Sequence, residues 1–134
     1  MIFLSREWVE ALAEMLRNDE DYQKKGKGFD SYYQIVATPS PEKGVTEDKA
    51  CGLLLPMATE TWMGVRDQVD YTMTAPYEVY YRIFKGDLNP VVAMTTGKAK
   101  LKGSMAKALR YSGATNKFVA VMKKLPTKFE GAFV

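Results

Sequence analysis

The chain has 134 residues, of which 46% are hydrophobic, and no stretch of it is long and apolar enough to span a membrane. The sequence therefore predicts one globular domain over residues 1–134 and excludes a disordered chain and a transmembrane helix. A single cysteine, Cys51, and the absence of histidine exclude an internal disulfide, a zinc site with cysteine or imidazole ligands, and histidine-dependent nucleophile systems.

Charge is unevenly distributed along the chain. Residues 1–97 carry 10 basic and 15 acidic side chains, whereas residues 98–134 carry 9 basic side chains and one acidic side chain, Glu130. The cationic C-terminal segment is typical either of a solvated basic face or of a surface that meets lipid headgroups or nucleic acid. The N-terminus lacks the basic region of a secretory signal, so the sequence predicts a cytoplasmic protein.

The first predicted element is an amphipathic helix with Ser5 as its N-cap. It ends in the polar run 18–21, and the Lys/Gly-rich run 24–28 predicts a flexible connection. The buried face of the helix follows the i, i+4, i+7, i+8 spacing of Trp8, Leu12, Met15 and Leu16.

Four strands are predicted next, over residues 29–38, about 50–57, 61–66 and 69–74. Each is rich in β-branched, aromatic or other apolar residues and is bounded by turn residues. Because short loops join them, we expect an antiparallel meander.

A helix follows that starts after Thr74–Pro76 and ends near Gly86. Asn89 is a good N-cap, and Pro90 suits the first position of a second, short helix that Gly97 ends. Residues 98–102 alternate lysine with Ala99 and Leu101, which predicts a fifth strand with its lysines in water.

Two more helices are predicted at the C-terminal end. A short helix around Met105 precedes a break at Ser112–Gly113, and an amphipathic helix then ends at Pro126. The element order favours an α+β fold, in which helices cover one face of a five-stranded, mainly antiparallel sheet.

The segment from Val69 to Tyr111 resembles the sterol carrier protein-2 (SCP2) family of intracellular lipid-binding domains. The matching residues are a strand ending at Thr74, a helix to Phe84, then Gly86-x-Leu88-Asn89-Pro90, Met94, and Gly97-Lys98-x-Lys100-Leu101-x-Gly103-Ser104-Met105. The resemblance implies an apolar tunnel between the sheet and the helices for a sterol, fatty acid, acyl-CoA or phospholipid. Position 99 is Ala where the family usually has a larger aliphatic residue, so the tunnel is expected to be wider there.

From this resemblance we expect a non-catalytic lipid-binding protein without a cofactor or metal, existing as a monomer or homodimer. Methionines on the apolar faces of several elements suit a pocket for ligands of variable shape, although they equally fill gaps in an ordinary core. On the sheet, the expected ligand contacts are Leu53, Leu55, Met63, Tyr71, Met73 and Leu101. On the helices, they are Tyr80, Phe84, Val91, Met94, Met105, Leu109, Phe118 and Met122.

The C-terminal helix is the predicted lid, because it can move without disrupting the sheet. Its lysines are candidates for transient contact with a lipid headgroup or an anionic membrane, the alternative being a solvated polar face. These candidates are Lys117, Lys123, Lys124 and Lys128.

Three other functions remain open at this point. A nucleic-acid-binding protein would use the basic C-terminal segment with Tyr111 and Phe118, but Phe118 belongs to an apolar helix face, so no nucleic acid is expected. An enzyme would need Asp70, Tyr71 or Tyr80, whose spacing is not diagnostic of any reaction. An accessory module that presents lipid to a lipid-metabolising enzyme would use the same tunnel.

Overall fold

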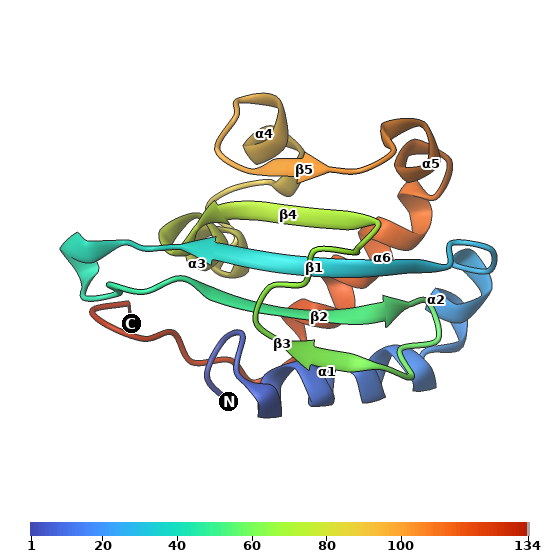
Figure 1. Cartoon of the computed structure of the whole chain (residues 1–134), viewed down its shortest axis with the longest axis horizontal. Helices are drawn as coiled ribbons and strands as arrows, with labels where there is room; N and C mark the ends of the chain where they lie inside the picture. Colours follow the sequence, from blue (N-terminus) through green and yellow to red (C-terminus); the bar gives the residue numbers. More distant parts are fainter. Residues whose placement is uncertain (134) are drawn as a thin grey trace.

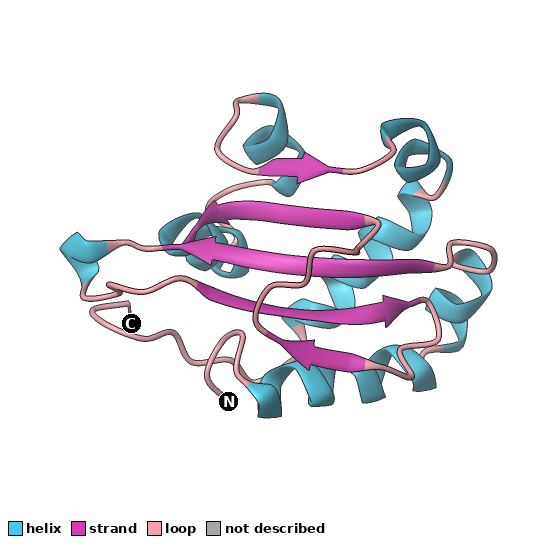
Figure 2. Ribbon diagram, viewed as in Figure 1, coloured by secondary structure: helices cyan, strands magenta, loops and turns pink. Residues whose placement is uncertain are grey.

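The computed structural model describes residues 1–133 as one five-stranded sheet with helices packed on one of its faces. Figure 1 views the sheet from its uncovered face, with α3 and α6 behind it, and Figure 2 separates helices from strands by colour. The strands are β1 (Ser31–Thr38), β2 (Lys49–Leu55), β3 (Thr61–Met63), β4 (Tyr71–Pro76) and β5 (Lys100–Lys102). The helices are α1 (Arg6–Asn18), α2 (Glu20–Lys25), the 3-10 helix η1 (Pro41–Lys43), α3 (Tyr77–Lys85), α4 (Pro90–Thr95), α5 (Met105–Arg110) and α6 (Ser112–Lys123).

The strand order is β3-β2-β1-β4-β5, and every neighbouring pair is antiparallel except β1 and β4, which are parallel. The predicted α+β fold with a five-stranded, mainly antiparallel sheet is therefore confirmed. The predicted four-strand meander is wrong at its last step, because β4 pairs with β1 and not with β3.

The connection from β3 to β4 explains this difference. It passes across the uncovered face of the sheet, in front of β2 and β1 (Figure 1). The buried side chain of Gln34 anchors it: Oε1 accepts hydrogen bonds from the Arg66 backbone N–H at 2.7 Å and from Trp62 Nε1 at 3.4 Å. Trp62 lies over Gly52, where a Cβ atom would come within 2.1 Å of the indole ring. The Gln34 hydrogen bonds and the close packing of Trp62 on Gly52 thus hold the β3–β4 connection, called the β3–β4 crossover below, against the sheet.

The N-terminal helix forms as predicted, with the Ser5 hydroxyl accepting from the Trp8 backbone N–H at 3.2 Å. The run 24–28, however, is not simply a flexible connection. Lys24 and Lys25 belong to α2, because the Asp19 carboxylate caps a second helix by accepting from the Tyr22 N–H at 2.8 Å. The buried Tyr22 side chain then fixes this helix against the core.

The expected break at Ser112–Gly113 is also wrong, because α6 begins at Ser112. Only Tyr111 separates α5 from α6, and its N–H donates to the carbonyls of Lys107 and Ala108 at 3.3 and 3.2 Å. The two helices therefore form a bend. This bend places α5 beside β5 while α6 runs behind the sheet (Figure 1).

The N-terminal residues pair with residues 126–128, at the side of the molecule away from α5 (Figure 1). Ile2 bridges Lys128 in a parallel pairing, and Phe3 lies at the centre of an aromatic cluster. The ring centroids of Trp8, Tyr77, Tyr80, Phe84 and Phe129 all lie 5.0–5.7 Å from that of Phe3. We call these six residues the aromatic cluster; they fill one end of the space between the sheet and the helices.

Candidate functional site

Three adjoining cavities lie between the helix-covered face of the sheet and helices α3 to α6. We call them the large chamber (about 360 Å³), the middle chamber (about 90 Å³) and the small chamber (about 20 Å³). Tyr33 and Thr115 line all three, so these two side chains stand where the chambers meet. The large chamber lies under α4, α5 and the start of α6, at the β5 edge of the sheet.

The structure brings eleven of the fourteen expected contact residues to these chambers. Tyr71, Met73, Val91, Met94, Leu101, Met105 and Leu109 line the large chamber. Met73, Tyr80, Met94, Phe118 and Met122 line the middle chamber, and Leu55 and Phe118 line the small one. These side chains come from β2, β4, β5 and all four of the helices α3 to α6.

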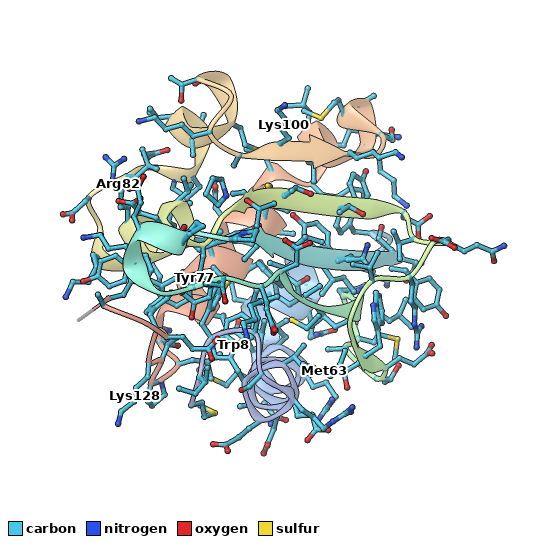
Figure 3. All side chains as sticks on the ribbon, turned by 60° about the vertical axis from the view of Figure 1, so that its left-hand side comes forward. Trp8, Met63, Tyr77, Arg82, Lys100 and Lys128 are labelled. Atoms are coloured by element: carbon cyan, nitrogen blue, oxygen red, sulfur yellow. The ribbon has the colours of Figure 1, made fainter. Side chains whose placement is uncertain are left out.

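The remaining three expected residues lie away from the chambers. Leu53 is fully buried in β2. Met63 is on the edge strand β3 and 37% exposed, far from β5 in Figure 3. Phe84 packs into the aromatic cluster, 5.4 Å from Phe3 and 5.2 Å from Phe129. Each was expected at the site because it lies at an inward or apolar position of its element. Leu53 and Phe84, however, pack into the core, and Met63 lies at the edge of the sheet.

Several lining residues were not expected from the sequence, chiefly Phe29, Tyr33, Ile35, Ile83 and Thr115, whereas Ala99 lines the middle chamber at the position where the tunnel was expected to be wider. Strand alternation along 29–38 does place Tyr33 and Ile35 on one face. The sequence did not show that β1 pairs with β4. In the parallel register of these strands, Tyr33 lies beside Tyr71 and Ile35 beside Met73, both of which were expected ligand contacts.

Two of the tyrosine hydroxyls in the chamber walls are hydrogen-bonded to backbone carbonyls. The Tyr71 hydroxyl donates to the Ser104 carbonyl at 2.7 Å, and the Tyr80 hydroxyl lies 3.0 and 3.1 Å from the carbonyls of Met73 and Val36. Burial raises the pKa of Tyr71, against a smaller lowering by its Ser104 bond, and burial also raises the pKa values of Tyr33 and Tyr80. These phenols stay protonated at neutral pH, so their shifts are opposite to those of a general base.

The other groups considered for catalysis do not reach the chambers. The Asp70 carboxylate accepts from the Tyr32 N–H at 2.8 Å and is exposed on the uncovered side of the sheet. Residues 1–133 contain no group of three or more His, Cys, Asp or Glu side chains placed to hold a metal ion. None of the helices in this part of the chain is long and apolar enough to cross a membrane.

A wider groove of about 770 Å³ lies on the uncovered face, between the β3–β4 crossover and strands β4 and β5. Its walls carry Arg66, Asp67, Asp70, Lys100 and Lys102. Charged groups of both signs make it a hydrated surface, which does not suit a hydrocarbon chain.

The four candidate headgroup lysines have different surroundings. Lys117 lies 3.7 Å from Asp19 and 3.8 Å from Asp21, so it ties α6 to α2. Lys123, Lys124 and Lys128 are exposed, at and beyond the C-terminal end of α6. Figure 3 shows Lys128 at the opposite end of the molecule from Lys100 on β5. None of these three lysines lines the large chamber, and Lys128 lies far from the β5 edge where that chamber is found.

The comparisons with known proteins agree with this architecture. The family model described as the SCP-2 sterol transfer family matches residues 12–116. A crystal structure of sterol carrier protein 2 is 21% identical, with a TM-score of 0.81, over 92% of this chain and 98% of that chain. The solution structure of a conserved hypothetical protein from Thermus thermophilus is 21% identical, with a TM-score of 0.81, over 96% and 92% of the two chains.

A third solved structure, that of palmitated SCP2L2 from Aedes aegypti, is 18% identical, with a TM-score of 0.56, over 88% of this chain and 94% of that chain. At these identities the solved structures show a shared fold. The comparison with curated protein sequences gives no match.

Proposed function

The chain belongs to the SCP-2 sterol transfer family, and from this premise we propose that it binds an acyl-chain lipid in the large and middle chambers without catalysing a reaction on it. The family supports lipid binding or transfer in general. The observation that carries the specific proposal is the pair of adjoining chambers, about 360 and 90 Å³, walled mainly by methionine, aromatic and aliphatic side chains. The larger volume lies within the range of about 300–1,000 Å³ that is usual for small-molecule sites.

The shape of the site favours a flexible chain over a rigid ring system. Tyr33, Met73, Met94 and Thr115 line both the large and the middle chamber, so a ligand that fills both must pass between these side chains. An acyl chain can bend there, and methionine side chains can adjust around it. The palmitated state named for the Aedes aegypti protein supports the same ligand class, with a fatty acid, acyl-CoA or phospholipid as candidates.

Energetics indicates that the chambers are filled in the working protein. An empty, dry cavity of about 360 Å³, at roughly 24 cal/mol per Å³, would lower the free energy of unfolding by about 9 kcal/mol. This is an upper limit, because the large chamber is open to water. It is nevertheless comparable to the whole stability of a small domain, about 5–15 kcal/mol, so bound lipid should stabilise the fold strongly.

The proposal includes the setting in which the protein acts. The whole chain, 1–134, acts as one lipid-binding domain in the cytoplasm, as a monomer or homodimer, and makes transient contact with anionic membranes. A nucleic-acid-binding role is not proposed. Phe118 is only 8% exposed and lines the middle chamber. Tyr111 packs against Phe29, with ring centroids 5.1 Å apart. Neither ring is free to stack on a base.

The test is to purify the protein, identify bound lipid by native mass spectrometry and extraction, and compare melting temperatures before and after lipid removal. We expect co-purifying acyl lipid, and a lower melting temperature for the stripped protein. Bare protein that also fails to take up a fluorescent fatty acid would refute the proposal.

Two variants on α6 locate the ligand. Thr115→Trp places an indole where the three chambers meet and should abolish lipid binding. Ala120→Trp adds the same group at an exposed position that lines none of the chambers, and should leave binding unchanged. Equal lipid content in the two variants would place the ligand elsewhere.

A further inference from the structure

Exposed apolar side chains gather around the large chamber. Val91 and Val92 on α4 are 56% and 47% exposed, and Met105 and Leu109 on α5 are 51% and 69% exposed. Three of them, Val91, Met105 and Leu109, also line the large chamber, so its wall continues onto the surface. We call these four residues the apolar rim. Figure 1 shows α4 and α5 at the same edge of the molecule, one near each end of β5.

The segment that carries the apolar rim is basic, although Asp30 and Asp70 lie near its cations on neighbouring segments. Residues 88–116, which include α4, β5 and α5, contain no Asp or Glu. Their basic residues are Lys98, Lys100, Lys102, Lys107 and Arg110. Lys107 lies beside the chamber wall: its Nζ donates to the Asp30 carbonyl at 3.3 Å and lies 5.6 Å from the ring centroid of Phe29, which lines the large chamber. By contrast, α1 carries three glutamates, Glu7, Glu10 and Glu14.

Exposed apolar side chains on a segment that carries five basic and no acidic residues match the surface of a bilayer that contains anionic lipid. The apolar groups can enter the boundary between headgroups and acyl chains, while lysine and arginine contact the headgroups. A second protein copy would bring the same positive charges face to face, which disfavours a dimer at this surface.

We propose that the apolar rim and its flanking lysines dock the protein on anionic membranes, with the large chamber facing the bilayer. This inference rests on the proposed function, because docking here lets an acyl chain pass between membrane and chamber without crossing water. It also assigns the membrane contact to the α4–β5–α5 edge and not to Lys123, Lys124 and Lys128. Lys123 ends α6 and the other two follow it in the chain, whereas the large chamber is lined by residues at the start of α6. Figure 3 shows Lys128 far from Lys100 on β5.

Two triple variants with equal charge change test the location. One replaces Lys98, Lys100 and Lys102 by Gln, and the control replaces Lys123, Lys124 and Lys128 by Gln. Binding is measured by flotation with vesicles of equimolar phosphatidylcholine and phosphatidylserine, and with pure phosphatidylcholine. At about 1 kcal/mol per lysine near an anionic surface, the first variant should lose about 100-fold in vesicle affinity, and the control should stay near wild type.

A single substitution tests the apolar contribution. Val92 does not line any of the chambers, and it is the third residue of α4, where glutamate favours a helix. Val92→Glu should therefore keep the fold and the uptake of a soluble fluorescent fatty acid, yet lose vesicle binding. Because uptake is measured without vesicles, failure of the proposed function and failure of membrane docking are distinguishable.

Three results would overturn the inference. Equal vesicle affinity of the two triple variants would show that net charge alone drives binding. A concentration-dependent dimer that Val92→Glu disrupts, without vesicle binding by the wild type, would make the rim a contact between copies. Salt-dependent binding of single-stranded DNA, lost in the Lys98/Lys100/Lys102 variant and without vesicle binding, would make it a nucleic-acid surface.

Discussion

Ala99→Leu should stabilise the lipid-free protein and weaken its binding of long acyl chains. Ala99 is 4% exposed and lines the middle chamber of about 90 Å³. Leucine adds three carbons, which at about 0.8 kcal/mol each contribute about 2.4 kcal/mol when buried. The chamber itself, at roughly 24 cal/mol per Å³, corresponds to about 2.2 kcal/mol. Both routes give an upper limit of about 2 kcal/mol, or a rise of about 6 °C in melting temperature.

The same side chain takes the space that the end of a long chain would occupy. Loss of about three buried methylenes weakens binding by about 2.4 kcal/mol, or about 50-fold, for chains that reach the middle chamber. Shorter chains that stop in the large chamber should bind as before. Urea unfolding of the delipidated protein and displacement titrations with fatty acids of increasing length measure the two effects.

Ala120→Leu, at an exposed position on α6, is the matched control and should change neither quantity. The reasoning is wrong if Ala99→Leu destabilises the delipidated protein and leaves the affinity for every chain length unchanged. That result would mean that the middle chamber is too tight for three carbons and that ligand does not enter it.

Three further predictions concern the sheet. Burial raises the pKa of Cys51 to about 12, so between about pH 9 and 12 the thiol ionises only in the unfolded chain. The Cys51 thiol should therefore lower the free energy of unfolding by about 1.4 kcal/mol for each pH unit in this range, and Cys51→Ala should remove that part of the pH dependence in urea unfolding. Gln34→Leu leaves the Trp62 Nε1–H and the Arg66 N–H without their acceptor and should lower unfolding free energy by about 2–4 kcal/mol in urea. Gly52→Ala should displace Trp62, with a changed tryptophan fluorescence and a loss of about 1–3 kcal/mol.

Element boundaries in this chain were predictable where the deciding atoms lie within a few residues. Ser5 caps α1, and the Asn89 side chain accepts from the N–H of Val91 at 2.8 Å to start α4 at Pro90. Gly86 ends α3 with a φ of 82°, which favours glycine. These caps depend on local hydrogen bonds, so the sequence alone is sufficient to predict them.

The position of β4 in the sheet was not predictable in the same way. Alternation along 69–74 shows which side chains share a face, but it contains no information on which strand is the neighbour. The neighbour is decided by contacts across more than thirty residues, chiefly those of Gln34 with Arg66 and Thr72. A buried glutamine in the middle of an apolar strand was the one available signal that something polar crosses there.

For the candidate site as well, sequence periodicity predicted some features and not others. The apolar stripe of α3 includes Tyr80, Ile83 and Phe84, of which Tyr80 and Phe84 were the predicted ligand contacts. In the structure, Tyr80 and Ile83 line the middle chamber, whereas Phe84 lines none of the chambers and packs against Phe3 and Phe129. Helical periodicity identifies a buried face, but which part of that face meets a cavity depends on residues distant in the sequence, such as Phe129 beside Phe84.

The same arrangement leads to an expectation about which helix moves if lipid enters the large chamber. The sequence favoured the C-terminal helix as the lid, but α6 buries Ala114, Phe118, Val121 and Met122 and is tied to α2 through Lys117. Helix α5, in contrast, buries none of its residues and forms part of the wall of the large chamber. Segments with few buried apolar contacts open at low free energy, so α5 can swing out while the sheet and the aromatic cluster stay packed. Buried contacts are therefore concentrated in α6 and the aromatic cluster, and we expect ligand to enter beside α5.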